Sequence, residues 1–387
     1  MRRLSHSSIM FVLLGMALAT LLGGSEPVKL AEAQQAAATG LAPRTVTVLV
    51  GGGQDTIILD NFFPRTLRVR VGDTVRWKFN GDATHHFHTV TFSGGPFPGP
   101  KLAVSGGGPD EVIPGRWVPV PGGQPGELMR NPAEAWPTRQ PGAPVETYHG
   151  TMYVNSGHMR MSPPRVAGMP ASQTFSLTFT KPGMYRYDCA VHPHMHGTIE
   201  VVPTDAADVP SQAAIDKQAK AEADHLLALI EKAKGLGKTI RSQPGPNGTS
   251  FWFVRAGAFD VSGEMRGQLF DFMPKSLTVK AGDTVIWESV DPHTITFNPM
   301  PPAPEPFIVK SRSDGPPHLV QNPKVFQPSK PAQVYDAAQY FNSAAVGMTT
   351  PLGTSWPLTF DKPGVYEYIC AFHEQMGMKG TITVVPR

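Results

Sequence analysis

The strongest constraint on the fold of this chain is that its sequence repeats. Residues 63–77 read FPRTLRVRVGDTVRW, and residues 273–287 read MPKSLTVKAGDTVIW. In both segments, apolar residues alternate with polar ones on each side of a Gly-Asp pair, which is the pattern of two β-strands joined by a turn. Forty prolines and 39 glycines add many turns and loops. We therefore predict an all-β fold built from two copies of one unit.

The repeat continues beyond these strands. His88-Thr-Val-Thr-Phe92 matches His293-Thr-Ile-Thr-Phe297, and a Lys-Pro-Gly turn precedes the last strands of each copy. Between the copies, residues 211–234 are rich in Ala, Lys, Glu and Leu and predict a helix that starts at Ser211 and ends at Gly235. A Gly/Pro/Asn/Ser linker follows at 236–250. The predicted division is a leader at 1–33, domains at 45–203 and 250–387, and a helical linker at 204–249.

The N-terminus has the features of a secretion signal. Arg2 and Arg3 precede an uncharged apolar run over residues 9–22, and Ala31-Glu32-Ala33 offers a cleavage site. We expect a periplasmic or extracellular protein, with an uncleaved N-terminal membrane anchor as the alternative. The net charge of +3 gives no reason to expect a nucleic-acid partner.

The two cysteines of the chain occupy matching places. Cys189 and Cys370 each follow a Tyr-x-Tyr-x segment and precede the pattern Cys-x-x-His…Met. In an oxidising compartment two cysteines could form a disulfide, but such a bond would join two copies of one motif. We therefore favour metal ligation, because thiolate, imidazole and thioether are the ligands of a blue-copper centre.

With these motifs, the chain resembles the cupredoxins, the plastocyanin and amicyanin family of blue-copper electron carriers, in a tandem form. The resemblance covers roughly residues 45–203 and 250–387. It implies two Greek-key β-sandwiches joined by an α-helix and a flexible linker, each with one type 1 copper. The ligands that it implies are His88, Cys189, His192 and Met195 in the first copy, and His293, Cys370, His373 and Met378 in the second. Met376 is the alternative axial ligand in the second copy.

Several other histidines and methionines lie near these motifs. They are either ordinary loop and core residues or ligands of additional copper. The candidates for a second site in the first copy are His85, His86, His194 and His196. A set that could hold Cu(I) is His149, Met152, His158, Met159 and Met161.

The residues that flank the cysteines bear on enzymatic activity. Multicopper oxidases have His-Cys-His at the blue-copper cysteine, and copper nitrite reductases have His directly before it. Here Asp188 and Ile369 precede the cysteines, and Ala190 and Ala371 follow them. We therefore expect one-electron transfer between redox partner proteins rather than catalysis. The alternatives are copper storage, delivery or resistance and, less favoured, an oxidase or nitrite-reductase-like enzyme.

Overall fold

The structure is a computed structural model. It describes residues 42–81, 87–94, 101–103, 112–114, 117–139, 143–160, 172–192, 194–236, 239–259, 266–299, 303–313, 315–329, 335, 339–347 and 353–387. The predicted leader, His85, His86 and Met161 lie outside these ranges. Among the described residues, no helix has both the length and the apolar character needed to cross a membrane.

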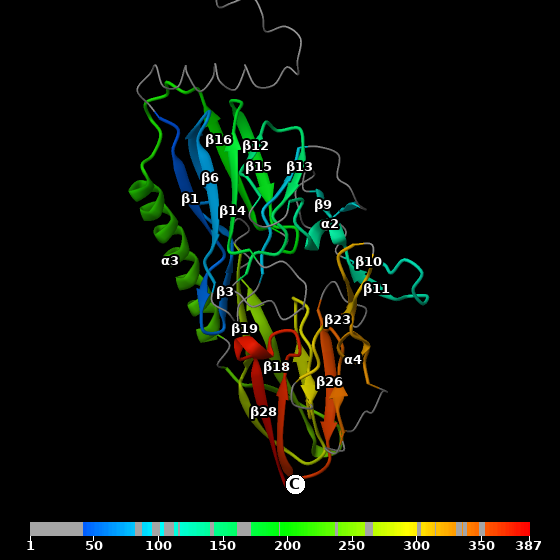
Figure 1. Cartoon of the computed structure of the whole chain (residues 1–387). Helices are drawn as coiled ribbons and strands as arrows, with labels where there is room; N and C mark the ends of the chain where they lie inside the picture. The colour runs from blue at the N-terminus through cyan, green and yellow to red at the C-terminus, as the bar shows by residue number, and fades with distance from the viewer. Residues whose placement is uncertain are drawn as a thin grey trace, which may run out of the picture.

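The first half of the chain forms a sandwich of two sheets (Figure 1). The first sheet has the order β12 (Glu146–Tyr148), β14 (Thr174–Phe179), β6 (Thr74–Phe79), β1 (Thr45–Val50) and β4 (Phe62–Phe63). The second has the order β13 (Tyr153–Asn155), β7 (Thr91–Ser93), β15 (Gly183–Asp188), β16 (His196–Val202) and β5 (Thr66–Arg70). The predicted alternation is confirmed in β6, where Val75, Trp77 and Phe79 point into the core.

The second half repeats this sandwich. One sheet has the order β2 (Gly53–Gln54), β3 (Ile57–Asp60), β19 (Arg266–Met273), β18 (Ser250–Phe259), β21 (Asp283–Glu288) and β26 (Ser355–Phe360), with β17 (Arg241–Pro244) paired to β18. The other has the order β20 (Ser276–Lys280), β28 (Lys379–Val385), β27 (Gly364–Ile369), β22 (Thr296–Phe297) and β25 (Phe341–Asn342). The all-β prediction is thus confirmed, whereas the residue limits of the two domains stay a prediction.

Strands from both halves share sheets. β3 comes from the first half but pairs with β19 of the second, with Asp60 opposite Arg266. The long segments that precede the two cysteines also pair with each other, through a sheet with the order β10 (Trp117–Pro119), β11 (Leu128–Arg130), β24 (His318–Gln321) and β23 (Phe307–Lys310). A separate hairpin consists of β8 (Lys101–Ala103) and β9 (Val112–Pro114). The two sandwiches are therefore held together by main-chain hydrogen bonds.

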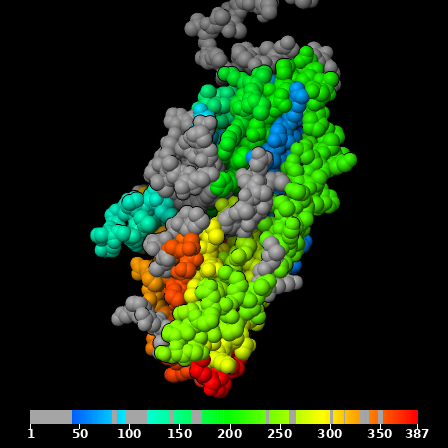
Figure 2. Space-filling view, turned by 180° about the vertical axis from the view of Figure 1, so that it is seen from behind, coloured from blue at the N-terminus to red at the C-terminus, as the bar shows by residue number. Residues whose placement is uncertain are grey.

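The predicted helix is α3 (Gln212–Leu236), and it lies along both halves (Figures 1 and 2). Ser211 caps it as predicted, because its Oγ accepts the N–H of Ala214 at 3.3 Å. The helix ends one residue beyond Gly235, the predicted end. Its buried face packs on strands of both halves; the shared cluster is Ile57, Leu59, Phe63, Ala219, Leu226, Ile230, Leu269 and Met273.

The other helical segments are short. They are α2 (Pro132–Ala135), α4 (Pro323–Phe326), and the 3₁₀ turns η1 (Pro246–Gly248) and η2 (Glu374–Met376). The predicted linker at 236–250 thus contains β17 and η1. β17 is ordered because its main chain pairs with β18, Arg241 opposite Phe253.

Candidate metal centres

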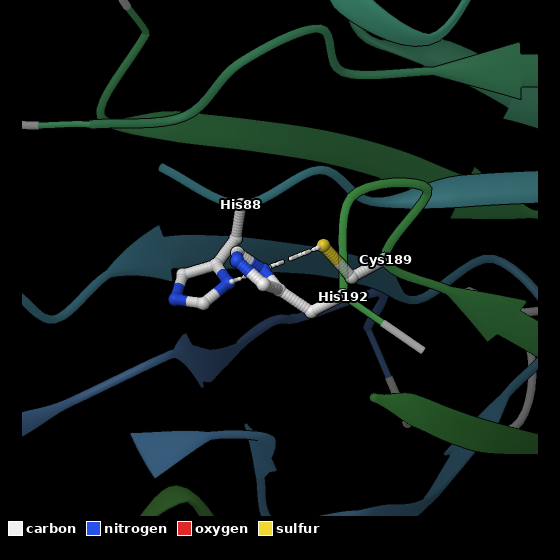
Figure 3. Close-up of side chains that lie close together, drawn as sticks. All are labelled: His88, Cys189 and His192. Atoms are coloured by element: carbon white, nitrogen blue, oxygen red, sulfur yellow. Dashed lines mark hydrogen bonds between the residues drawn. The ribbon is translucent and has the colours of Figure 1, made fainter. Parts of the chain in front are cut away.

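Three of the predicted ligands of the first half meet in one cluster (Figure 3). The Sγ of Cys189 lies 3.5 Å from Nδ1 of His192 and 4.0 Å from Nδ1 of His88. The two Nδ1 atoms are 3.1 Å apart. Cys189 is fully buried and His88 is 1% exposed, whereas His192 is half-buried. One sulfur and two nitrogens therefore converge at the edge of the core.

The second half contains a matching cluster. The Sγ of Cys370 lies 3.4 Å from Nδ1 of His373 and 3.7 Å from Nδ1 of His293. The two Nδ1 atoms are 3.0 Å apart. Cys370 is fully buried, His293 is 1% exposed, and His373 is half-buried. Among the described residues, these two His-Cys-His clusters are the groupings of His, Cys, Asp and Glu that could hold a metal ion.

The two distant histidines are held by their main chains. His88 and Met159 exchange two main-chain hydrogen bonds, of 3.1 and 2.7 Å. His293 and Val346 do the same, at 3.0 and 2.8 Å. Each histidine is thereby fixed by an isolated β-bridge, far from the cysteine in sequence but close to it in space.

Each of these histidine rings also lies against a glycine. A Cβ on Gly51 would stand 2.5 Å from Nε2 of His88, and one on Gly257 would stand 2.3 Å from Nε2 of His293. Both glycines have a positive φ, of 70° and 73°. Any larger residue would displace the ring.

The cysteine and the second histidine of each cluster come from one loop. The predicted axial methionine closes this loop. The N–H of Cys189 donates to the carbonyl of Met195 at 2.8 Å, and the N–H of Cys370 donates to that of Met378 at 3.1 Å. Both methionine side chains are fully buried, in the same cores as the cysteines. Met376 is partly buried at the edge of the second core. The assignment of Met195 and Met378 as axial ligands stays a prediction.

The donor set fits a soft cation. Burial raises the pKa of the Cys189 thiol to about 11, although the main-chain N–H of Thr89 opposes the shift. Burial likewise raises the pKa of Cys370. A buried thiolate without a cation is unstable, yet each sulfur receives an N–H at 3.4 Å, from Thr89 or Thr294. The sites are therefore suited to thiolates that are neutralised by a metal.

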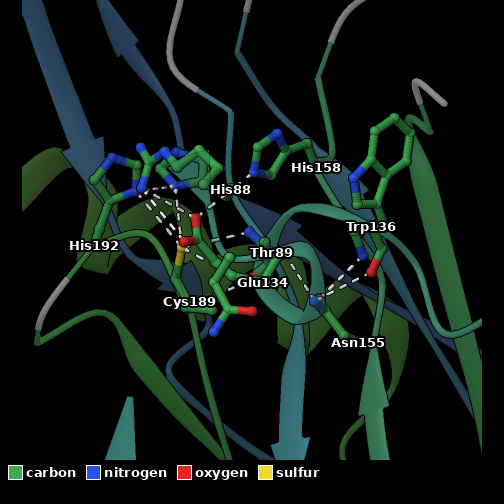
Figure 4. Close-up of polar contacts among 12 residues, drawn as sticks. His88, Thr89, Glu134, Trp136, Asn155, His158, Cys189 and His192 are labelled. Carbon is green, nitrogen blue, oxygen red and sulfur yellow. Dashed lines mark hydrogen bonds and ion pairs between the residues drawn. The ribbon is translucent and has the colours of Figure 1, made fainter. Parts of the chain in front are cut away.

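A buried hydrogen-bond chain supports the first cysteine loop (Figure 4). The N–H of Ala190 donates to Oγ1 of Thr89 at 2.7 Å, and the hydroxyls of Thr89 and Thr91 lie 2.9 Å apart. Thr91 donates to Oδ1 of Asn155 at 3.3 Å. The amide of Asn155 then donates to the carbonyls of Ala133 and Glu134, at 2.7 and 2.8 Å, in α2. The loop is thereby tied to a short helix.

The second half repeats this chain. Ala371 donates to Thr294 at 2.7 Å, Thr294 lies 2.9 Å from Thr296, and Thr296 donates to Asn342 at 2.9 Å. The amide of Asn342 donates to the carbonyls of Lys324 and Val325, both at 3.0 Å, in α4. Sequence reasoning missed both asparagines. The available signal was an Asn-Pro pair followed by an Asn-Ser pair in each copy.

One feature of the first half has no equivalent in the second. Arg130 donates to Glu134 of α2 at 3.3 Å, and Nε2 of His158 lies 3.7 Å from the same carboxylate (Glu134 and His158 in Figure 4). Glu134 is fully buried and His158 is 3% exposed. The matching positions in the second half are Val325 and Ala345. The two sites therefore have different surroundings.

The structure gives the surroundings of the other described candidate ligands. His194 lies in the cysteine loop with a φ of 68°, and His196 begins β16 and contacts Arg65. His149 accepts or donates a 2.9 Å hydrogen bond with Thr151, and Met159 is buried. Met152 packs at the edge of the first core. Their role in binding additional copper stays a prediction.

Comparisons with known proteins find relatives of part of the chain. A family model described as copper binding proteins, plastocyanin/azurin family, matches residues 259–385. Plastocyanin from Scenedesmus fuscus is 31% identical over 115 residues, which cover 29% of this chain and 85% of that protein.

Solved structures are similar over part of the chain. Oxidised plastocyanin from Dryopteris crassirhizoma is 22% identical and covers 34% of this chain and 99% of its own, with a TM-score of 0.20. A purple cupredoxin from Nitrosopumilus maritimus is 22% identical and covers 34% of this chain and 98% of its own, with a TM-score of 0.19.

Proposed function

The chain belongs to the plastocyanin/azurin family of copper-binding proteins, and on that basis we propose that it carries one type 1 copper in each half and transfers single electrons between redox proteins. The observation that carries this proposal is the pair of His-Cys-His clusters with closely similar separations. Copper supplies a one-electron couple at such a ligand set. The main-chain bonds of His88 and His293 would hold the ligands in place in both oxidation states.

The exposure of the ligands supports electron exchange at the surface. His192 and His373 are half-buried, whereas the other histidine and the cysteine of each cluster are buried. The half-buried histidine is therefore the ligand through which an electron would enter or leave. The rest of the cluster would be shielded from water by the core.

Copper counting combined with electron paramagnetic resonance tests the proposal. The intact chain should bind two coppers, both with the type 1 signal and an intense visible absorption. Cys189→Ser and Cys370→Ser should each lose one copper and about half of that absorption. A chain that binds at most one copper, or that stays colourless on oxidation, would refute the proposal.

The same experiment separates the alternative, which is copper storage, delivery or resistance. That function requires more than two coppers per chain and ready release to a chelator. We also propose that the protein is exported, because residues 1–33 have the features of a signal peptide. N-terminal sequencing of the protein isolated from its natural compartment would test this, since cleavage after Ala33 is expected.

A further inference from the structure

The two proposed copper sites also differ at a buried position on the sheet that the halves share. The β3 segment reads LDNFFP over residues 59–64, and the β19 segment reads LFDFMP over residues 269–274. Phe62 and Phe272 occupy the same place, because each packs on a core tyrosine with ring centroids 4.6 Å apart. Two residues earlier, Asp60 in the first half therefore matches Phe270 in the second.

Phe270 gives the second site an apolar wall. Its ring stacks on the ring of His373, with centroids 4.0 Å apart and planes 14° apart. It also lies 5.8 Å from the ring of His293, edge to face. Phe270 is fully buried, so the second site is shielded on this side by hydrocarbon.

Asp60 gives the first site a buried carboxylate. Asp60 is fully buried. The main-chain carbonyl of its neighbour Asn61 accepts the N–H of Gly51 at 2.8 Å, and Gly51 is the glycine that lies against the ring of His88. Asp60 also takes the place at which Phe270 of the second half stacks on His373. The carboxylate therefore lies in the wall of the first site, where its charge would act on a bound metal.

The positive partner of Asp60 belongs to the second half. Nε of Arg266 lies 3.7 Å from Asp60, and the amide of Gln268 donates to the same carboxylate. The other end of the guanidinium donates to both oxygens of Asp291 at 2.8 Å. One arginine is therefore shared between two carboxylates, so the three side chains together carry a net negative charge.

We propose that Asp60 makes the first copper the site of lower reduction potential, so that electrons enter at the first half and pass to the second. This inference rests on the proposed function of both sites. A nearby negative charge stabilises Cu(II) relative to Cu(I), and an apolar wall has the opposite effect because it disfavours the more charged state. One electron leaves a one-electron reductant, passes from the first site to the second, and goes to a one-electron oxidant.

The shared sheet provides a short connection for this transfer. The N–H of Phe270 donates to the carbonyl of Thr56 at 2.7 Å. Thr56 directly precedes β3 and Asp60 is its last residue, so the chain rises about 13 Å between them at roughly 3.3 Å per residue. The surroundings of the two sites therefore meet on one strand.

Potentiometric titration of the visible absorption tests the proposal, with one site read at a time. Cys370→Ser leaves the first copper to be measured, and Cys189→Ser leaves the second. We expect a lower potential for the first. Asp60→Asn, which keeps the size and the acceptor for Gln268, should raise the potential of the first site and leave that of the second unchanged.

A second variant separates charge from structural damage. Arg266→Gln removes the positive partner of Asp60 and should lower the potential of the first site. Damage to the site would instead shift the potential in the same direction in both variants. The matched control is Asp73→Asn, which changes a buried carboxylate directly before β6. Phe79, at the other end of β6, is the residue that lies beside His88, and it is about 20 Å of strand away from Asp73. The control should leave both potentials unchanged.

The proposal is overturned if the first site has the higher potential, if Asp60→Asn leaves that potential unchanged, or if both charge variants shift the potential in one direction. If neither single-site variant binds blue copper, the proposed function itself fails.

Discussion

The side-chain amide of Asn61 donates to the main-chain carbonyl of Arg266 at 2.7 Å, which joins two residues 205 positions apart. Asn61 is 1% exposed, and the bond lies at the pairing of β3 with β19. It is one of the contacts that join the two halves beside the candidate metal centres.

Asn61→Ala should reduce the free energy of unfolding by about 1–3 kcal/mol, because the carbonyl of Arg266 loses its buried donor. Denaturant unfolding of the copper-free chain measures this loss. Gln218→Ala is the control, since it removes an exposed hydrogen bond from the side-chain amide of Gln218 to Glu222 in α3. An equal, small loss in both variants would contradict the importance of the β3–β19 contact.

Ile230→Ala should destabilise the chain by about 2–5 kcal/mol, because Ile230 is fully buried where α3 packs on both halves. Its Cγ1 lies so close to Gly267 that a Cβ there would stand 2.6 Å away. The same denaturant measurement applies, with the exposed Lys232→Ala as control. A loss below about 1 kcal/mol would show that the helix is not docked.

Thr89→Val should cost about 1–3 kcal/mol, because the buried N–H of Ala190 loses its acceptor while the size of the side chain is kept. We also expect faster release of copper from the first site, measured with a chelator. Thr74→Val is the control, since Thr74 bonds to Thr178 at the half-buried outer face of the sheet. Unchanged copper release in Thr89→Val would contradict a role for the hydroxyl chain.

The copper-free protein should lose stability as the pH rises above about 9. The thiol of Cys189 ionises near its ordinary pKa of 9.0 in the unfolded chain but only at about 11 in the folded chain. Between these two values the folded state binds more protons than the unfolded state. The free energy of unfolding therefore falls by about 2–3 kcal/mol as the pH rises across that window. Unfolding of the wild type and Cys189→Ser from pH 8 to pH 11 measures this, and parallel curves would contradict it.

The copper-loaded protein should lose stability as the pH falls below about 6.5. Burial lowers the pKa of His158, although Glu134 opposes the shift. The unfolded chain therefore takes up a proton near pH 6.5 that the folded chain takes up only at lower pH, so stability falls with pH. His158→Gln should flatten the unfolding curve between pH 7 and 5, whereas the exposed His225→Gln should not. An unchanged slope in His158→Gln would contradict the prediction.

Local features of the chain made much of this predictable. The alternation in 66–70 and 74–79, the helix after Ser211 and the close spacing of Cys189 and His192 all depend on residues near one another in sequence. Because the two copies repeat the same motif, His88 could be matched to His293 and chosen over its neighbours. The structure brings both predicted His-Cys-His sets together.

Other features depend on contacts between distant segments. The pairing of β3 with β19 cannot be read from either strand, because neither alternates: β3 is buried throughout and β19 along most of its length. Asn155 and Asn342 were missed for a related reason, since their partners lie on short helices that no periodicity marks.

The sequence by itself thus determined the strands, the connecting helix and the identity of the two sets of candidate ligands, because short-range patterns and a repeated motif encode them. Only the tertiary structure decided what surrounds each set. Asp60 lies opposite Arg266, and Phe270 stacks on His373, in a sheet that strands from both halves share. A buried charge and a buried ring act through space, so their effects follow from the fold and not from the motif.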